Sequence, residues 1–487
     1  FRLTVGGELR DAADGGTFET VDPSTGEVLA SVPQAGGVDV DDAVASANRA
    51  QPAWDRLGVR GRREYFEQLG AAIEERATEL AMLDAIDAGN PYTAMLRDVG
   101  FALASLKDWP ALALGLTGDV VPEASPGKNL HYTLYEPYGV VARIVPFNHP
   151  VLFAINSVLP PLIAGNAVVM KPAEQTPLSA LAFGELAAEV LPPGVVNVVS
   201  GGAETGDALV THRDIKRIAF TGSTATALKI QRRVAEFGLK HLSFELGGKN
   251  AMIVFPDADV EAAVAGAVNG MNLTVCQGQS CGSNSRILVH AQAYDAFLEG
   301  LRARFEAIRV GPAYAPDVEM GPLVSAAHRD RVLGYIASGK AEGARLVAGG
   351  GVPRGANGGY FVEPTALADV SMEMRIAREE IFGPVVSVLR WTDYSAMLEQ
   401  ANAVEYGLTA SIWTNDLSVA HRTAQRLDAG YIWINDTSKH FFGTPFGGTK
   451  NSGLGREESM EELVSYCEQK AVHAILQDPE DALARIA

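Results

Sequence analysis

Cysteine is scarce in this chain, whose 487 residues include only Cys276, Cys281 and Cys467. An odd, sparse set in a long chain argues against a disulfide framework and indicates reduced thiols. The sequence opens at Phe1 without the charged and then apolar leader that directs secretion. These features together predict a cytoplasmic protein.

Basic residues are also few, 40 against 59 acidic residues, which gives a net charge of −19. Such a surface repels polyanions, so we expect no nucleic-acid partner and no membrane surface as a partner. The longest stretch without a charged residue, 144–170, is interrupted by proline, glycine and asparagine. It predicts a buried helix followed by a buried strand and not a membrane span.

The chain is longer than one hydrophobic core usually organises, which predicts at least two structural units. Residues 17–33 indicate a hairpin, and helical periodicity marks 38–56 and 59–88. Short apolar strands then alternate with helices, which predicts one parallel α/β sheet from 140–145, 167–171, 195–199, 217–221 and 251–254. A second such unit is expected from 286–289, 361–367, 385–391, 409–414 and 431–435. The segments 129–138 and 463–476 are strand-prone and fit neither unit.

Cys281 is the candidate nucleophile, because Gly278 and Gly282 permit an exposed turn around it and a buried strand follows. A carboxylate base is available at Glu245, in the segment Phe244 to Lys249. Free cysteine is more often a small buried hydrophobe. That interpretation suits Cys276 as a wall residue and Cys467 as a structural one.

Four further motifs accompany the nucleophile: Pro146 to Pro150, Lys171 to Glu174, Glu380 to Pro384 and Pro445 to Gly453. In this order the motifs resemble the aldehyde dehydrogenase superfamily from end to end, in its hydrolytic, non-acylating branch. The resemblance implies an α/β fold with a Rossmann-like NAD-binding domain (1–118 and 139–246) and an α/β catalytic domain (247–446). It also implies a small β oligomerisation arm with the C-terminal tail (119–138 and 447–487), and hence a homodimer or homotetramer.

The resemblance assigns catalytic roles to Cys281, Glu245, Asn148 and Lys171. A carboxylate with a pKa of about 4.3 is a poor base for a thiol with a pKa of about 8.5. We therefore expect Glu245, tuned by burial, to deprotonate the water that attacks a thioester. Asn148 is expected to donate its side-chain amide to the oxyanion, together with the backbone N–H of Cys281.

The Gly-x-Gly-x-x-Gly fingerprint is absent after the first parallel strand, so the sequence does not support the usual mode of dinucleotide binding by Rossmann folds. The resembled family binds the dinucleotide without it, through residues such as Lys171 and Glu174 at a strand end. Glu174 would bind the adenosine ribose and oppose a 2′-phosphate, which predicts NAD with NADP as a poorer substitute. Ser223 suits either the pyrophosphate or an ordinary helix N-cap. The predicted cofactor residues are Pro146, Phe147, Lys171, Ala173, Glu174, Gly201, Gly206, Phe220, Gly222, Ser223, Leu246, Glu380 and Phe382.

The substrate pocket is expected from residues near the nucleophile and from the loop 436–444. They are His149, Asn272, Val275, Ser280, Gly282, His440, Phe441 and Phe446. Lys439 is the one cation among the pocket positions and the loop, and no arginine is present, which favours an apolar or aromatic aldehyde over a dicarboxylic semialdehyde. An aminoaldehyde stays open through aromatic residues and Asp436. A coenzyme A-acylating enzyme or a non-catalytic protein fits less well with Glu245 and Cys281 both present, and no metal is expected.

Overall fold

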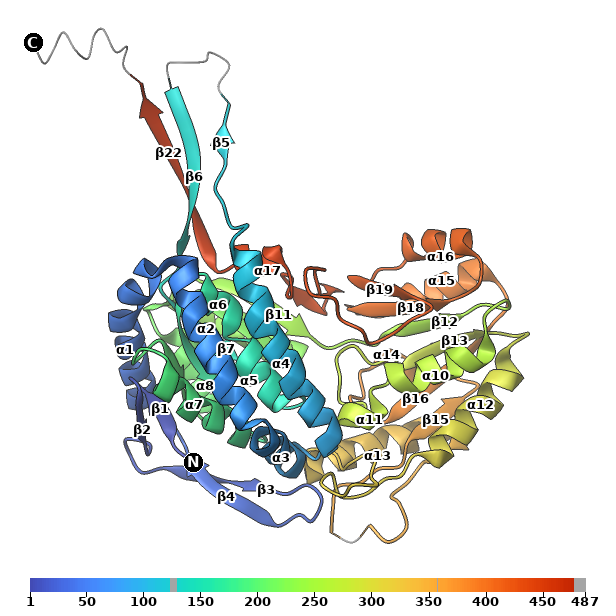
Figure 1. Ribbon diagram of the computed structural model, residues 1–487. Helices are drawn as coiled ribbons and strands as arrows, with labels where there is room; N and C mark the ends of the chain where they lie inside the picture. Colours follow the sequence, from blue (N-terminus) through green and yellow to red (C-terminus); the bar gives the residue numbers. More distant parts are fainter. Residues whose placement is uncertain (123–128, 357, 477–487) are drawn as a thin grey trace, which may run out of the picture.

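Two large β-sheets organise the protein into two lobes (Figure 1). The computed structural model describes residues 1–122, 129–356 and 358–476. The first sheet has the strand order β2-β1-β9-β8-β7-β10-β11-β21, and the second has the order β14-β15-β16-β13-β12-β18-β19. The predicted α/β architecture is therefore confirmed.

The first lobe is built around parallel strands β7 to β11, with antiparallel strands at both edges. Val140 and Ala142 face one core cluster and Val141 faces another, as expected for a sheet covered on both faces. Its strands are β1 (Leu3–Val5), β2 (Glu8–Arg10), β7 (Val140–Ile144), β8 (Ala167–Lys171), β9 (Val196–Val198), β10 (Ile215–Gly222), β11 (His241–Leu246) and β21 (Gly453–Leu454). Its helices are α1 (Gly37–Arg56), α2 (Gly58–Glu75), α3 (Ala77–Ala88), α4 (Tyr92–Ala113), α5 (Pro150–Asn156), α6 (Leu159–Ile163), α7 (Leu178–Val190), α8 (Ala203–Thr211) and α9 (Thr224–Phe237).

The second lobe contains the loop that carries Cys281. Its sheet strands are β12 (Ala251–Val254), β13 (Arg286–His290), β14 (Arg345–Ala348), β15 (Thr365–Ala368), β16 (Val385–Trp391), β18 (Thr409–Trp413) and β19 (Tyr431–Ile434). The helices are α10 (Val260–Gly270), α11 (Leu273–Cys276), α12 (Tyr294–Ala307), α13 (Ala326–Ala341), α14 (Arg375–Arg378), α15 (Tyr394–Asn402) and α16 (Leu417–Ala424).

The assignment of 251–254 to the first sheet was wrong. This strand, β12, lies inside the second sheet between β13 and β18. The first sheet instead gains β11, which the strand series omitted. The chain crosses between the lobes at Gly247 and Gly248, and alternation of strands and helices alone cannot reveal such a crossing.

Other expected elements have shifted bounds. The hairpin at 17–33 is present as β3 (Thr17–Val21) and β4 (Val28–Pro33), but β1 and β2 precede it. The helix expected over 59–88 is divided at Arg76 into α2 and α3. The expected strand 463–476 begins as a short helix, α17 (Met460–Val464), before β22 (Cys467–Ile475).

The uncharged stretch 144–170 folds as the short buried helices α5 and α6 followed by the buried strand β8. Among the described residues, no helix combines the length and the hydropathy that a membrane crossing requires.

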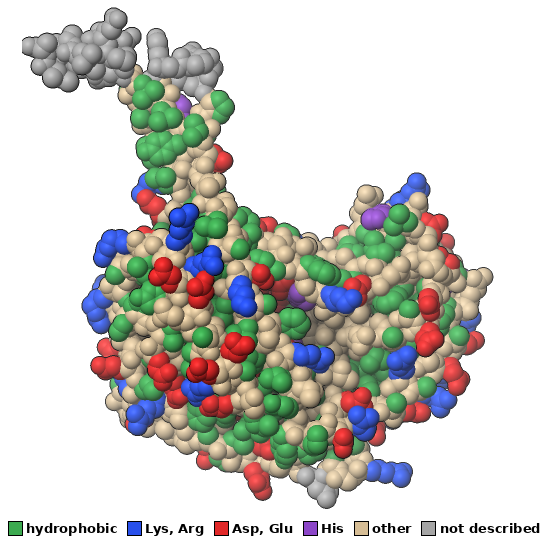
Figure 2. Space-filling view, viewed as in Figure 1, with side chains coloured by type: hydrophobic (Ala, Val, Ile, Leu, Met, Phe, Trp, Pro, Cys, Tyr) green, Lys and Arg blue, Asp and Glu red, His purple; other side chains and the backbone are tan. Residues whose placement is uncertain are grey.

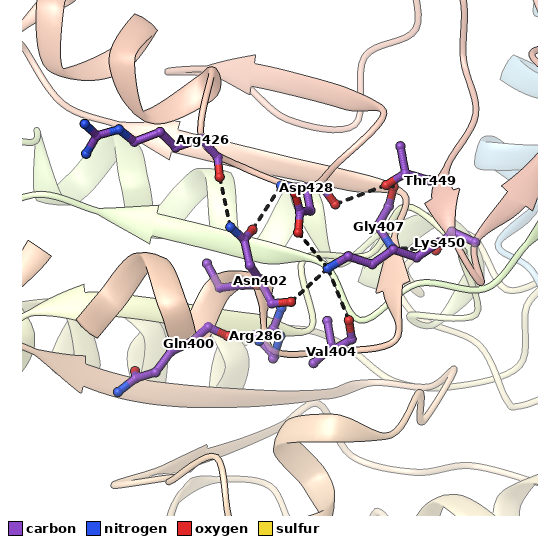
Figure 3. Close-up of polar contacts among 11 residues, drawn as sticks. Arg286, Gln400, Asn402, Val404, Gly407, Arg426, Asp428, Thr449 and Lys450 are labelled. Carbon is purple, nitrogen blue, oxygen red and sulfur yellow. Dashed lines mark hydrogen bonds and ion pairs between the residues drawn. The ribbon is translucent and has the colours of Figure 1, made fainter. Parts of the chain in front are cut away.

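A short C-terminal segment connects the two lobes. Its first part, β20 (Thr449–Lys450), pairs with β17 (Tyr406–Gly407) of the second lobe. Its second part, β21, pairs with β11 of the first lobe, so that Gly453 lies opposite Glu245. Figure 3 shows the Lys450 ammonium donating to the carbonyl oxygens of Asn402 and Val404, at 2.8 and 3.4 Å.

A narrow three-stranded sheet projects from the first lobe (Figure 1). It contains β5 (Val120–Val121), β6 (Asn129–Pro137) and β22, and β6 and β22 pair along their whole length. The predicted arm segments 119–138 and 447–487 include this sheet, although 123–128 and 477–487 lie outside the described residues. The proposed domain boundaries themselves stay a prediction.

Candidate active site

The carboxyl ends of β7, β8, β10 and β11 open onto one cavity of about 1300 Å³. This is the sheet edge at which parallel α/β folds bind ligands. The cavity extends from Glu174 and Lys229 to Cys281, Glu245 and Asn148. Residues predicted separately as cofactor and catalytic groups therefore line the same space.

Cys281 lies on the loop between α11 and β13, which needs unusual backbone conformations. Gln277 and Gly278 both have positive φ angles, 55° and 73°, and a Cβ at Gly278 would lie 2.4 Å from the carbonyl oxygen of Gly383. Asn250 fixes the far side of the loop by donating to the carbonyl oxygens of Cys281 and Ser283 at 2.6 and 2.9 Å. Cys281 is partly exposed, whereas Cys276 and Cys467 are buried, and all three thiols are free.

Glu245 is the penultimate residue of β11, lies beside the nucleophile and is 5% exposed. Burial raises the pKa of its carboxyl well above the usual value, and the charge of Glu457 acts in the same direction, while contact with the Cys281 thiol opposes both. Burial likewise raises the pKa of the Cys281 thiol, and the neighbouring Glu245 raises it further. Burial therefore disfavours the charged form of both groups.

Asn148 follows β7 and is buried next to Pro150, the first residue of α5. Asn90 donates from Nδ2 to the Asn148 backbone oxygen at 2.8 Å and so fixes the turn. Within the described residues, neither the Asn148 side-chain nitrogen nor the Cys281 backbone N–H donates to a protein acceptor. Both donors are thus available to an oxyanion.

Lys171 and Glu174 lie at the end of β8, where the ribose site was predicted. The Lys171 ammonium is 3.8 Å from the Glu174 carboxylate and donates to the Pro172 carbonyl at 2.9 Å. Burial lowers the pKa of Lys171, and Glu174 partly opposes that shift. The Glu174 side chain is half exposed, so it can reach a ligand in the cavity.

Ser223 serves as the N-cap of α9, the alternative that the sequence left open. Its Oγ accepts from the Thr226 backbone N–H at 3.2 Å and donates to Thr226 Oγ1 at 3.0 Å. Ser223 nevertheless lines the cavity at the positive end of α9, where a pyrophosphate would be stabilised. The other predicted cofactor residues that line the cavity are Pro146, Phe147, Ala173, Gly206, Phe220, Gly222, Leu246, Glu380 and Phe382. Gly201 does not line it; it lies against Thr205 at the start of α8.

Glu380 reaches across from the second lobe to the end of β11. Its Oε1 accepts from the Gly248 backbone N–H at 3.0 Å, and burial raises its pKa to about 7. A Cβ on Gly247 would lie 2.1 Å from the other carboxylate oxygen, so glycine is needed for this approach. The cavity, the buried carboxylate and the α9 terminus together fit a dinucleotide.

The predicted substrate residues lie outside this cavity. Cys281 packs against a cluster that includes Tyr431, Trp433 and Phe446, and the centre of the His440 ring lies 4.4 Å from that of Phe446. His149 binds Asp98 through Nδ1 at 2.7 Å. The loop 436–444 meets α4 where Phe442 contacts Trp109 at 4.9 Å, and Figure 2 shows the surface hollowed between the lobes on this side. Asn272, Val275, Ser280, Gly282 and Phe441 do not line the cofactor cavity either.

Sequence reasoning missed several residues around the site. His328 and Arg331 of α13 line the cavity, Asn250 holds the nucleophile loop, and Glu457 acts electrostatically on Glu245. Only Asn250 and Glu457 lie within or near a recognised motif. In the described part of the chain, no group of three or more histidine, cysteine, aspartate or glutamate side chains is placed to bind a metal ion.

The fold and the site define an oxidoreductase, and comparison with known proteins identifies its class. The sequence model of the aldehyde dehydrogenase family matches residues 10–472, so the chain belongs to this family and is an aldehyde dehydrogenase. An aldehyde dehydrogenase of Talaromyces stipitatus is 45% identical over 465 residues, which are 93% of this chain and 89% of the relative. A betaine aldehyde dehydrogenase of Rhizobium etli is 41% identical over 473 residues, 96% of each chain.

Solved structures give the same result. An aldehyde dehydrogenase from Bacillus cereus in complex with NAD+ is 40% identical, with a TM-score of 0.94 over 98% of this chain and 96% of the other. An Escherichia coli enzyme described as NADP-dependent is 34% identical, with a TM-score of 0.94 over 98% of each chain. Relatives of this fold thus include enzymes of both cofactor types.

Proposed function

We propose that this aldehyde dehydrogenase uses NAD to oxidise an apolar or aromatic aldehyde to the carboxylic acid. The observation that carries the proposal is the shared cavity, which joins the Glu174 carboxylate, the proposed ribose contact, to the Cys281–Glu245 pair. In the first half-reaction the Cys281 sulfur adds to the aldehyde carbon as its thiol proton passes to water. Asn148 and the Cys281 backbone N–H stabilise the oxyanion of the thiohemiacetal.

Bound NAD would supply the acceptor for the hydride that leaves this thiohemiacetal. The remaining thioester on Cys281 is then cleaved by water, and Glu245 takes the proton of that water. The burial of Glu245 supports this role, because it raises the pKa of the carboxyl and so makes the carboxylate a stronger base toward water than an exposed one. Because Glu245 is present to activate water, hydrolysis of the thioester is favoured over transfer of the acyl group to coenzyme A.

Preference for NAD over NADP is supported by charge at Glu174. A 2′-phosphate next to this carboxylate would meet like charge. Lys171, 3.8 Å from Glu174, would attract either dinucleotide. NADP is therefore proposed as a poorer substitute.

An aminoaldehyde is the second candidate substrate, because the rings of Tyr431, Trp433 and Phe446 beside Cys281 could hold a cation. The nearby carboxylates are already paired, however: Asp436 with Lys439 at 3.0 Å, and Glu458 with His440 at 2.8 Å. Apolar and aromatic aldehydes are favoured for that reason.

The test combines a substrate panel with product analysis. NADH formation would be measured with benzaldehyde, an aliphatic aldehyde of similar size, an aminoaldehyde and betaine aldehyde, each with and without coenzyme A. We expect the highest kcat/KM for one of the first two, and the free carboxylate as product in both cases. A higher kcat/KM for betaine aldehyde would favour the second candidate, and an acyl-coenzyme A product would refute the hydrolytic assignment.

A further inference from the structure

His440 is the polar member of an aromatic group beside the nucleophile. Its ring centre lies 4.4 Å from that of Phe446, and the ring stacks on that of Tyr431 with centres 6.1 Å apart. Cys281 packs against the cluster that contains Phe446 and Tyr431. An aromatic substrate bound at Cys281 would therefore lie against rings that His440 also contacts.

Only one nitrogen of His440 is bound to the protein. Its Nδ1 lies 2.8 and 3.0 Å from the two carboxylate oxygens of Glu458. Among the residues that the structure describes, Nε2 has no hydrogen-bond partner, and the side chain is 41% exposed. A carboxylate only accepts, so Nδ1 carries a proton, and a charged ring carries a second proton on Nε2. The free nitrogen can then donate to a ligand.

Glu458 favours the charged form of this ring. Burial lowers the pKa of His440, but the charge and the hydrogen bond of Glu458 outweigh burial, so the pKa is raised overall. Nε2 therefore remains a donor to higher pH than it would in an unpaired histidine. Hydrogen bonds from a charged donor are also about twice as strong as those from a neutral donor.

The backbone around this pair is fixed on both sides. The Trp433 indole donates to the Lys439 carbonyl oxygen at 2.8 Å, directly before His440. The Gly443 N–H donates to the Glu458 carbonyl oxygen at 2.8 Å. Glu458 has a φ of 64°, in the left-handed region that such a residue adopts only when its surroundings hold it there. The donor is therefore oriented before a substrate binds, which lowers the entropic cost of binding.

The other histidine near the site, His149, is not equivalent to His440. Its Nδ1 binds Asp98 at 2.7 Å, and its side chain is only 16% exposed. The buried Cys276 thiol is a second neighbour of its ring. A ligand beside the nucleophile thus meets a free imidazole donor at His440 and not at His149.

The charges around His440 favour a neutral ligand group over an anionic one. Glu458 balances the charge of His440, and Asp436 lies 3.0 Å from the Lys439 ammonium. A substrate carboxylate would therefore meet no unbalanced positive charge. It would also be repelled by Glu457, whose charge acts on His440. A hydroxyl oxygen needs only the donor.

We propose that His440 is a specificity-determining residue that donates from Nε2 to a ring hydroxyl of an aromatic aldehyde. The aldehyde carbon lies at Cys281, and the substrate ring packs against Phe446 and its neighbours. Hydroxylated aromatic aldehydes are therefore the substrate class that this site selects. The inference rests on the proposed use of aromatic aldehydes.

The test compares each of the three hydroxybenzaldehydes with the methylbenzaldehyde substituted at the same ring position. A methyl group and a hydroxyl group are similar in size, but only the hydroxyl accepts a hydrogen bond. At one ring position, His440→Phe should lower kcat/KM for the hydroxyl compound about tenfold or more, chiefly by raising KM, and change the methyl compound less than about twofold. The intrinsic reactivities of the two aldehydes cancel, because both enzymes receive the same pair.

Two further variants serve as controls. His440→Gln keeps a side-chain donor and should recover part of the activity with the hydroxyl compound that His440→Phe loses. His421→Phe makes the same replacement at an exposed histidine of α16, whose side chain has no hydrogen bond among the described residues. It should treat every pair of aldehydes as the wild type does.

Equal losses for the hydroxyl and methyl compounds in His440→Phe would overturn the inference, because His440 would then only shape the pocket. Identical kinetics of His440→Phe and the wild type with every pair would overturn it as well. A wild-type enzyme that oxidises no compound of the panel would instead refute the proposed use of aromatic aldehydes.

Discussion

Burial holds the pKa values of the Cys281 thiol and the Glu245 carboxyl above their usual ranges, and the two groups lie against each other. The resting nucleophile is therefore a thiol and not a thiolate, and it becomes reactive only when its proton is removed. Cys276 lies five residues earlier but is fully buried. Substituting each cysteine in turn can therefore show which of the two thiols is the nucleophile.

Cys281→Ala should abolish aldehyde oxidation, with loss of at least about 10³-fold in kcat, because no other thiol reaches the cavity. NAD affinity should be retained, since Cys281 contributes nothing to the ribose and pyrophosphate sites. Steady-state NADH formation and calorimetric titration with NAD would measure the two effects. Cys276→Ala is the matched control and should keep its activity; the reverse pattern would show that Cys276 is the nucleophile.

Glu245→Gln should separate the two half-reactions. The amide cannot accept a proton from water, so thioester hydrolysis slows, whereas formation of the first NADH depends less on this group. Rapid mixing of enzyme with excess NAD and aldehyde should therefore show a burst of NADH followed by a slow steady state. Loss of the burst itself would mean that Glu245 activates Cys281.

Glu174→Gln should narrow the ratio of kcat/KM for NAD over NADP. Neutralising the carboxylate removes like-charge repulsion of the 2′-phosphate and weakens the ribose hydrogen bonds of NAD by roughly 1–2 kcal/mol. Kinetics with both dinucleotides at a fixed aldehyde concentration would give the ratio. An unaltered ratio would place Glu174 away from the ribose.

The motifs were sufficient to predict residues whose side chains reach the cavity, such as Cys281, Lys171 and Glu380. They could not predict His328 and Arg331, because these residues bind backbone carbonyl groups of residues 380–382, and any segment offers such groups. Glu457 was missed for a related reason: its influence on Glu245 depends on β21 lying beside β11, a pairing between distant parts of the chain.

At the scale of elements, periodicity predicted most helices and strands but not their sheet. Strand β12 follows β11 after only four residues, yet it belongs to the other lobe. The sequence indicated that the turn residues Gly247 and Gly248 belong to a catalytic motif, and in the structure they also contact the Glu380 carboxylate. Local sequence thus specifies an element, whereas long-range pairing decides its neighbours.

The connecting segment 449–454 gives a stability prediction at this scale. Gly453 has a φ of 156°, and a Cβ there would lie 2.4 Å from the Phe244 carbonyl oxygen. Gly453→Ala should therefore destabilise the protein by about 3 kcal/mol and reduce activity, because β11 carries Glu245. Thermal unfolding would be compared with Gly100→Ala, whose Cβ would meet nothing within 4 Å and which should be at least as stable as the wild type, because alanine is favoured over glycine in a helix interior such as α4 by about 1 kcal/mol.

At the scale of the whole molecule, the described part of the projecting sheet exposes several large apolar side chains. Leu130 and Leu134 are 37% and 42% exposed on β6, and Val120 and Ile475 are exposed on its neighbours. Exposed apolar surface on a sheet is typical of a contact with another protein chain. We therefore propose that the arm joins copies of this chain into a dimer or tetramer.

The double variant Leu130→Asp/Leu134→Asp should shift the protein to monomers, since it places charges in the proposed interface. Light scattering after size-exclusion chromatography would measure the mass. Leu239→Asp is the control, because Leu239 is a fully exposed leucine of the main body. Wild-type protein that is already monomeric at micromolar concentration would refute the proposal.

The pairing of β11 with β21 also constrains the order in which the protein can be completed during synthesis. Glu245 is translated about midway through the chain, but its strand partner Gly453 follows only near the end. Until then β11 is an open sheet edge, and such edges promote association with other chains. At about 5–20 residues per second, the ribosome leaves this edge uncovered for roughly 10 to 40 seconds. A chaperone would therefore be needed most at strand β11 of the nascent enzyme.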